Sequence, residues 1–345
     1  MGVHGITFWI ATTGAALYGS LWLWLTQRRR AAGTTLVLSL LPWFCAPLLY
    51  RVDWTDLSDE TVSVAAMQGN IPQQIKWDPD FLKEQIVTYL TMTEPHWDAD
   101  LILWPETAIP IPQDQAGSLI EHIAGRLGDH GTLITGIPWY GFSDRREDFT
   151  FHNSIMAIGN GEGIYHKQKL VPFGEYVPLE GLLRGLIGFF DLPMSSFTPG
   201  PAHQPPLRAN GLKVMPFICY EVAYPDFVAF NSRHSDLLLT ISNDGWFGDS
   251  IGPLQHLQMA RMRALETGRY LLRGTNNGVT AIIDHKGRIR QRIPQFERAT
   301  LVGQVRTATG STPYMQTGSW PVLTLALILV VFVRERQIPN ATPAA

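Results

Sequence analysis

The sequence contains very little cysteine: Cys45 and Cys219 are the two such residues in a chain of 345. Two cysteines cannot form a disulfide framework, and Cys45 lies inside a long apolar run where pairing with Cys219 would need unfavourable geometry. Charge is also scarce, because Asp, Glu, Lys and Arg make up 17% of the chain, against roughly 25% in an average globular protein. A net charge of −3, with no basic cluster beyond Arg28–Arg30, excludes a nucleic-acid-binding surface.

Three long stretches contain no charged residue. Ile6–Leu25 is 20 residues long, and as a helix it would extend about 30 Å, which matches the hydrocarbon core of a bilayer. It lacks the basic segment and small-residue cleavage site of a signal peptide. Gly33–Tyr50 has 18 residues and Thr317–Val333 is the third run. We expect two transmembrane helices within residues 1–50 and one over 317–333; the alternative for each is a buried core helix.

Basic residues indicate how these helices would be oriented. Arg28–Arg30 lie between the first two runs, and Arg334 and Arg336 follow the third. Loops rich in Lys and Arg stay on the cytoplasmic side of a membrane. We therefore expect residues 61–310 to be extracytoplasmic. The same rule places Met1 outside, which is unusual for a natural start and suggests missing upstream helices.

Residues 61–310 alternate between strand and helix patterns, which predicts one α/β domain. Helices are expected from Asp78, with Leu82, Ile86 and Leu90 on one face, around Leu119–Leu127, and over Pro253–Leu272. The polar tail 337–345 is expected to be disordered. The predicted strands are Val62–Ala66, Leu101–Trp104, Thr132–Ile137, Ser154–Ile158, Ile164–His166, Val214–Ile218, Leu237–Ile241, Val279–Asp284 and Ala299–Val305.

Three reactive side chains come directly after predicted strands. Glu106 follows Leu-Ile-Leu-Trp-Pro, Lys167 follows Ile-Tyr-His, and Cys219 follows Val-Met-Pro-Phe-Ile. Because strand ends can bring side chains from different strands into one crevice, we expect the three to meet. The carboxylate would take the thiol proton, the thiolate would attack a carbonyl carbon, and the ammonium would stabilise the oxyanion and lower the cysteine pKa. The set predicts covalent acyl transfer with Cys219 as the nucleophile.

Each residue has an ordinary interpretation when it is taken alone. A cysteine after an apolar strand is most often a core residue, a glutamate after Trp-Pro can cap a helix, and a lysine in His-Lys-Gln-Lys is usually solvated. If the Cys219 thiol were purely structural, however, the presence of the charged residue Glu221 two positions further along would be unexplained. The combination of residues favours a catalytic site.

Longer motifs surround these residues. With the order Glu106, Lys167, Cys219, they make the chain resemble the nitrilase superfamily and, within it, the family of apolipoprotein N-acyltransferases. The resemblance covers the α/β region from end to end, extends into the flanking apolar runs, and implies a four-layer αββα sandwich. The motifs are Met-Gln-Gly-Asn-Ile-Pro-Gln at 67–73, Leu-Trp-Pro-Glu-Thr-Ala at 103–108, Tyr-His-Lys-Gln-Lys-Leu-Val-Pro-Phe-Gly-Glu-Tyr-Val-Pro at 165–178, Ile-Cys-Tyr-Glu at 218–221 and Ile-Ser-Asn-Asp-Gly-Trp-Phe-Gly at 241–248.

The resemblance also implies a reaction, partners and a location. Cys219 would take an acyl chain from a phospholipid, with phosphatidylethanolamine the expected donor, and pass it from a thioester to the N-terminal amine of a diacylglyceryl apolipoprotein in a ping-pong sequence. No cofactor is expected, and the histidines have no metal-ligand spacing. The expected location is the bacterial inner membrane, with the catalytic domain on the periplasmic side. Family members usually carry several more N-terminal spans than the two within residues 1–50. This chain departs from the family at that end, but its catalytic motifs are intact.

Further residues are assigned supporting roles. Glu175 would orient Lys167 or the incoming amine, while Tyr220, Glu221 and Trp246 would shape the substrate pocket; ordinary packing is the alternative for these residues. A final group lies in an apolar loop, which is too hydrophobic for a free surface and is expected to be a lid that contacts the membrane. The lid residues are Leu186, Ile187, Phe189 and Phe190.

Two other functions remain open. A carbon–nitrogen hydrolase of the same superfamily would use water in the second step, but a small polar substrate needs no membrane spans. An inactive membrane scaffold is disfavoured because Glu106, Lys167 and Cys219 are all retained.

Overall fold

The chain divides into two compact units, each of which is described by itself. A computed structural model describes residues 2–143, 148–176, 178 and 197–336. One unit is Thr55–Gly310, and the other joins Met1–Trp54 with Ser311–Ala345. The predicted tail 337–345 and the predicted lid therefore lie outside the described residues.

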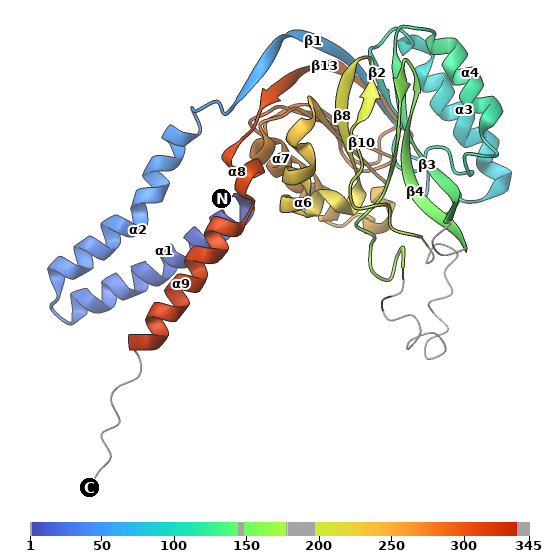
Figure 1. The fold of residues 1–345 in the computed structure, drawn as a ribbon. Coiled ribbons are helices and arrows are strands. Elements are labelled where there is room, and N and C mark those ends of the chain that lie inside the picture. The colour runs from blue at the N-terminus through green and yellow to red at the C-terminus, as the bar shows by residue number, and fades with distance from the viewer. Residues whose placement is uncertain (1, 144–147, 177, 179–196, 337–345) are drawn as a thin grey trace. The chain divides into compact units, whose positions relative to one another are not determined.

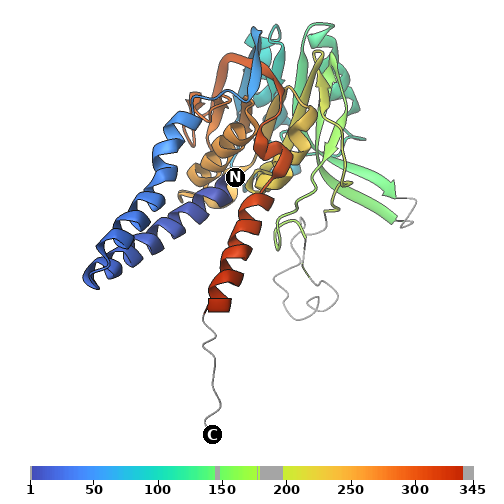
Figure 2. The same ribbon diagram turned by 60° about the vertical axis from the view of Figure 1, so that its left-hand side comes forward.

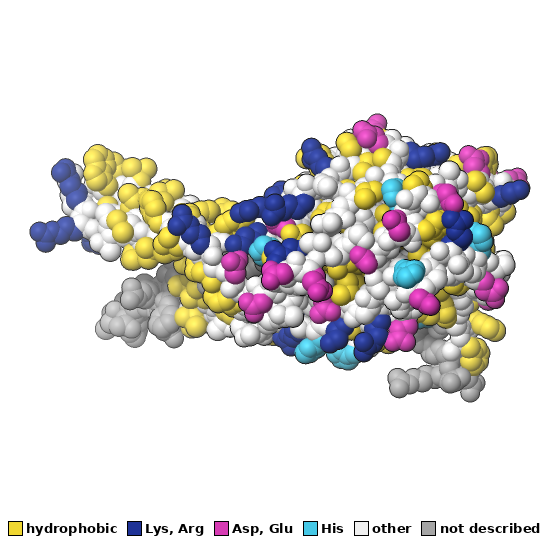
Figure 3. Space-filling model, turned by 90° about the horizontal axis from the view of Figure 1, so that it is seen from above, with side chains coloured by type: hydrophobic (Ala, Val, Ile, Leu, Met, Phe, Trp, Pro, Cys, Tyr) yellow, Lys and Arg dark blue, Asp and Glu magenta, His cyan; other side chains and the backbone are white. Residues whose placement is uncertain are grey.

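The smaller unit consists of helices. Helices α1 (Gly2–Leu25) and α2 (Arg29–Leu49) pack together, and the Trp43 indole nitrogen donates a hydrogen bond to Thr13 Oγ1 at 3.0 Å. In length and composition both could cross a membrane, and only 6% and 11% of their apolar windows are buried in the structure. Hydrophobic side chains accordingly cover much of the surface of these helices (Figure 3).

The third apolar run, 317–333, was expected to form one helix, but the structure divides it near its start. Residues Pro313–Thr317 form the short helix α8, and the long helix α9 covers Trp320–Arg336. Gly318 separates them with a φ of +57°, a left-handed conformation that favours glycine. The continuous run over 317–333 is thus interrupted at its start, and whether α9 spans a membrane remains a prediction.

The larger unit contains two β-sheets. The first has the strand order β13-β1-β2-β3-β4-β6 and the second β12-β11-β10-β9-β8-β7-β5. Central strands β1, β2 and β3 run parallel, as do β8, β9 and β10, with antiparallel strands outside them. The strands are β1 (Thr55–Gln68), β2 (Leu101–Leu103), β3 (Thr132–Ser143), β4 (Asp148–Gly159), β5 (Gly161–Glu162), β6 (Ile164–His166), β7 (Leu207–Ala209), β8 (Leu212–Ile218), β9 (Leu237–Ser242), β10 (Leu271–Thr275), β11 (Thr280–Ile283), β12 (Ile289–Ile293) and β13 (Ala299–Gly310).

The sheets face each other and helices cover their outer faces, which confirms the predicted αββα sandwich. Figure 1 shows α3 (Leu82–Thr93) and α4 (Gly117–Leu127) outside the first sheet, with α6 (Pro225–Asn231) and α7 (Gly252–Thr267) outside the second. A large apolar core joins residues from both sheets, and a smaller one lies between the first sheet and α3 and α4. Because side chains fill the space between the sheets, we expect the reactive groups to lie at the strand ends.

Two predicted elements need correction. The predicted helix 253–272 ends at Thr267, because Gly268 takes the left-handed conformation at φ +63° and caps it. Leu271 and Leu272 belong to β10 instead. The strand predicted over 132–137 continues to Ser143 and pairs along its full length with β4 in a long hairpin that projects from the body of this unit (Figure 2).

Candidate active site

Glu106 lies in a tight turn that follows β2. Trp104 continues the β2 ladder by donating to the Ile134 carbonyl, and Thr107 then takes a positive φ of 51°. The turn packs directly on Gly136 of β3, where an added Cβ would lie 2.4 Å from the Thr107 nitrogen. Only glycine therefore fits at position 136 without displacing Glu106.

Glu106 is buried, with 7% of the residue exposed. Asn153 of β4 donates to one oxygen at 2.7 Å, and the backbone N–H of Asn243, after β9, donates to the other at 2.7 Å. The two hydrogen bonds come from different sheets. They fix the orientation of the carboxylate.

Lys167 is almost fully buried beside two carboxylates. Its ammonium donates to Glu175 at 2.8 Å and lies 3.6 Å from a Glu106 oxygen. Burial alone would lower the lysine pKa, but the charges of Glu106 and Glu175 outweigh it and raise that pKa. Lys167 therefore stays a cation. Asn153 also donates to Glu175 at 3.0 Å, so Glu175 contacts both Lys167 and Asn153, and its role in orienting the lysine stays a prediction.

Cys219 begins a short turn directly after β8. It has a positive φ of 50°, a strained conformation for a residue with a Cβ, and its side chain is partly buried. Burial raises the pKa of the thiol, and the nearby charge of Glu106 raises it further, whereas Lys167 acts in the opposite direction. Lys167 thus lowers the cysteine pKa as expected, but burial and Glu106 outweigh it, and the pKa of the thiol is raised overall. The resting group is a thiol, which needs a base.

Glu221 connects the Cys219 turn to the Lys167 segment. Its fully buried carboxylate accepts hydrogen bonds from the Ile218 N–H at 2.8 Å and the Gln168 N–H at 2.7 Å, and from the Tyr165 hydroxyl. Burial raises the pKa of Glu221 to about 7. The residue holds two strand ends together rather than lining an open pocket.

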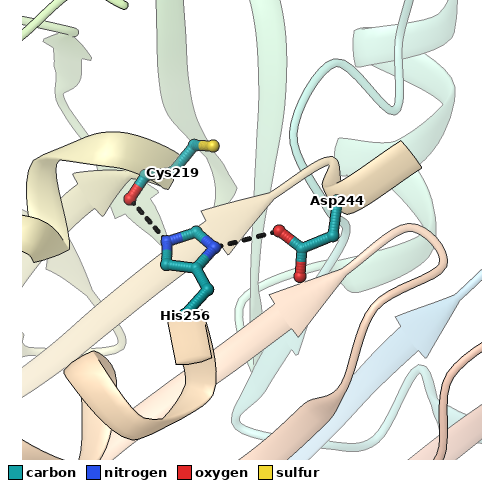
Figure 4. A group of neighbouring side chains, drawn as sticks. All are labelled: Cys219, Asp244 and His256. Carbon is teal, nitrogen blue, oxygen red and sulfur yellow. Dashed lines mark hydrogen bonds and ion pairs between the residues drawn. The ribbon is translucent and has the colours of Figure 1, made fainter. Parts of the chain in front are cut away.

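A buried His–Asp–Arg group lies behind the cysteine. His256 of α7 contacts Asp244 through Nδ1 at 3.0 Å and the backbone carbonyl of Cys219 through Nε2 at 3.0 Å. Figure 4 shows that the Cys219 sulfur points away from the imidazole. Arg273 donates to Asp244 at 2.8 Å and, with burial opposing it, keeps the pKa of that carboxyl low.

Cys219, Asp244 and His256 form the one group among the described residues with the composition and spacing of metal ligands. Both nitrogens of His256 already have partners, and Arg273 contacts the same carboxylate. A metal ion there would face the buried guanidinium at close range. The donor set therefore fits a hydrogen-bonded network better than a cation site.

The remaining supporting residues have varied surroundings. Tyr220 packs edge-on against Tyr224, with ring centroids 5.1 Å apart, and Trp246 is 64% exposed. Both flank segments that carry site residues, since Trp246 follows Asn243 and Asp244 in the turn after β9. The predicted lid residues Leu186, Ile187, Phe189 and Phe190 lie outside the described residues.

The sequence alone gave no reason to single out Lys76, Asn153 or His256. Asn153 lies within a strand, and His256 lies within a helix far along the chain from Cys219. Lys76 is buried, and its ammonium donates to the Glu106 backbone carbonyl at 2.8 Å. Nothing in their local sequence marks them, because each meets the site through contacts distant in the chain.

Residues 63–314 match the family model described as carbon-nitrogen hydrolase. The chain belongs to the carbon–nitrogen hydrolase family. Among curated relatives, it is 51% identical over 329 residues to a protein of Pseudomonas syringae pv. tomato named apolipoprotein N-acyltransferase, covering 95% of this chain and 64% of that protein. A protein of the same name from Azotobacter vinelandii is 49% identical, with 92% of this chain and 62% of that protein covered.

Solved structures of the family share the fold. The C. elegans NitFhit protein superposes with a TM-score of 0.54 at 15% identity, covering 76% of this chain and 64% of that one. A carbon-nitrogen hydrolase from Helicobacter pylori gives a TM-score of 0.52 at 12% identity, covering 71% and 88%. At such identities the likeness establishes architecture alone. The chain spans 64% and 62% of the two curated relatives' lengths.

Proposed function

We propose that this chain carries the catalytic domain of a phospholipid-dependent apolipoprotein N-acyltransferase. The proposal is based on sequence identity to relatives that bear this name. The identity is 51% and 49%, over alignments that cover 95% and 92% of this chain. The arrangement of Glu106, Lys167 and Cys219 supports it, because it provides a base, a cation and a nucleophile at the ends of strands from both sheets.

In the first half of the reaction, Cys219 would attack the sn-1 ester carbonyl of a phospholipid. Its thiol is protonated at rest, so Glu106 would accept the proton as the sulfur–carbon bond forms. Lys167, held as a cation, would stabilise the tetrahedral oxyanion. Glu106 would then return the proton to the departing glycerol oxygen. The products are a lysophospholipid and a Cys219 thioester.

In the second half, the N-terminal amine of a diacylglyceryl-cysteine would attack the thioester carbonyl. Glu106 would remove the amine proton and deliver it to the departing Cys219 sulfur, so that the same base serves both halves. An amide forms and the free thiol is regenerated. Glu175 would keep Lys167 in place, consistent with the 2.8 Å contact between them.

The proposed partners are a phospholipid, with phosphatidylethanolamine expected, and a diacylglyceryl apolipoprotein. The proposed location is the bacterial inner membrane in a multi-pass arrangement, with the catalytic unit on the periplasmic side. Helices α1 and α2 support membrane association because they are long and apolar enough to span it. The side follows from the arginines at 28–30, which the positive-inside rule places in the cytoplasm.

The name of the matched family favours hydrolysis as a second candidate, with water replacing the amine. Purified full chain in mixed micelles would be given phosphatidylethanolamine and a diacylglyceryl-cysteine peptide. Acyl transfer predicts triacylated peptide in amounts equal to the lysophospholipid formed. Free fatty acid in an amount equal to the lysophospholipid, with the peptide unchanged, would favour the hydrolase. Cys219→Ser is the control for both reactions.

A further inference from the structure

Lys76 is a buried lysine that has no role in the proposed reaction. It lies in the loop after β1, and 3% of the residue is exposed. Gln85 of α3 donates to the backbone carbonyl of Lys76 at 3.2 Å and to that of Ile75 at 2.9 Å. The loop is therefore fixed on α3, and the lysine side chain is directed into the protein.

The Lys76 ammonium ends at the peptide unit of Glu106. Its Nζ donates to the Glu106 backbone carbonyl at 2.8 Å. Within the described ranges no carboxylate lies close enough to form an ion pair with it, whereas Lys167 has two. A buried ammonium with a single neutral acceptor is unusual, because burial penalises the charged form unless a nearby negative charge compensates.

The compensating charges are those of the catalytic groups. Burial lowers the pKa of Lys76 to about 8, while the charges of Glu106 and Cys219 act to raise it. These two come from the turns after β2 and β8, and α3 contributes the neutral amide of Gln85. By reciprocity, a positive charge at Lys76 would favour negative charge at the Cys219 sulfur, where Lys167 is the stronger cation.

We propose that Lys76 is a positioning residue of the acyl-transfer site, which fixes the Glu106 turn through its carbonyl and supplies a second positive charge for the Cys219 thiolate. The proposal depends on the proposed function only in taking Cys219 as the nucleophile. When the thiol proton moves to Glu106, the negative charge moves from carboxylate to sulfur. Lys76 contacts the backbone of Glu106 and its charge acts on both Glu106 and Cys219, so it would stabilise the negative charge at either position.

The test is the rate at which iodoacetamide alkylates Cys219 in the full chain between pH 6 and 10, read by peptide mass spectrometry. The reagent reacts with the thiolate and needs neither lipid nor lipoprotein. Failure of this test would therefore be distinct from failure of acyl transfer. Lys76→Met removes the charge and keeps the length, Lys76→Arg keeps a charge that does not titrate, and Lys83→Met is the control at an exposed lysine.

At pH 7, Lys76→Met should alkylate about tenfold more slowly than the wild type, which corresponds to one pKa unit at the thiol. Lys76→Arg should match the wild type at pH 7 and exceed it at pH 9 to 10, where the wild-type lysine has lost its charge. Lys83→Met should follow the wild type throughout. Equal rates for wild type and Lys76→Met, or equal rates for the Met and Arg variants, would overturn the proposal.

The wild type alone provides a second measurement, which does not require the variants to fold. In the wild type alone, neutralisation of Lys76 opposes thiolate formation, so the rate should rise less steeply with pH above about 8 than below it. A uniform slope from pH 7 to 9 would contradict a titrating cation beside Cys219.

Discussion

His256 contacts Cys219 through the backbone and not through the sulfur. Its Nε2 lies 3.0 Å from the Cys219 carbonyl oxygen, and the side chain of Cys219 points the other way (Figure 4). A carbonyl oxygen only accepts hydrogen bonds, so Nε2 carries a proton and cannot remove one from the thiol. The imidazole instead supports the strained, positive-φ conformation of Cys219.

Replacing this histidine should therefore weaken the site without abolishing it. His256→Gln removes a buried hydrogen bond worth about 1 kcal/mol and should slow acylation of Cys219 by about five- to tenfold. The measurement is the time course of the acyl adduct by intact mass. A loss as complete as that of Cys219→Ser would contradict the backbone role and make His256 part of proton transfer.

Replacing Glu175 should affect a different half of the reaction from replacing Glu106 or Lys167. Lys167→Ala removes the oxyanion partner and should slow acylation by about two to three orders of magnitude, and Glu106→Gln should also leave Cys219 largely unacylated. Glu175→Gln can still accept a hydrogen bond from Lys167, so some adduct should form. If the Glu175 carboxylate acts on the incoming amine, the triacylated peptide should not accumulate in this variant. Adduct mass and peptide yield are measured together. Complete loss of adduct in Glu175→Gln would assign it to the first step, and a normal yield would make it structural.

Glu221 should make stability depend on pH. Its folded-state pKa of about 7 lies above its ordinary value of 4.5, so the native state retains the proton to a higher pH than the unfolded chain. Its contribution is fully present below about pH 4.5 and is lost as pH rises to about 7, amounting to up to about 3 kcal/mol. The wild type should lose melting temperature relative to Glu221→Gln across this interval. If the melting temperatures of the two proteins changed in parallel with pH, the proposed contribution of Glu221 would be refuted.

Membrane topology provides an independent check. In a variant without native cysteines, a cysteine at position 210 should react with a thiol reagent that cannot cross the inner membrane. A cysteine at position 29, between two arginines, should react only after the membrane is permeabilised. The opposite labelling would place the catalytic unit in the cytoplasm, away from its proposed lipoprotein substrate.

The sequence predicted those parts of the site that depend on local pattern. Apolar strands that stop at residues 103, 166 and 218 correctly placed Glu106, Lys167 and Cys219 at strand ends. The helix over 253–272 was extended too far, because apolar residues on either side of Gly268 fit one helical spacing and the capping conformation is invisible to periodicity. The contacts of Lys76 and His256 arise from segments far apart in the chain, which no local pattern encodes.

The most direct test is the mass of the chain after incubation with phosphatidylethanolamine in the absence of an acceptor. We expect the mass to increase by one acyl chain, located on the peptide that contains Cys219. Hydroxylamine should remove it, as it does a thioester, and Cys219→Ser should not acquire it. Addition of a diacylglyceryl-cysteine peptide should return the chain to its original mass as the triacylated peptide appears. An acyl chain on another residue, or turnover without an adduct on Cys219 and undiminished in Cys219→Ser, would contradict it.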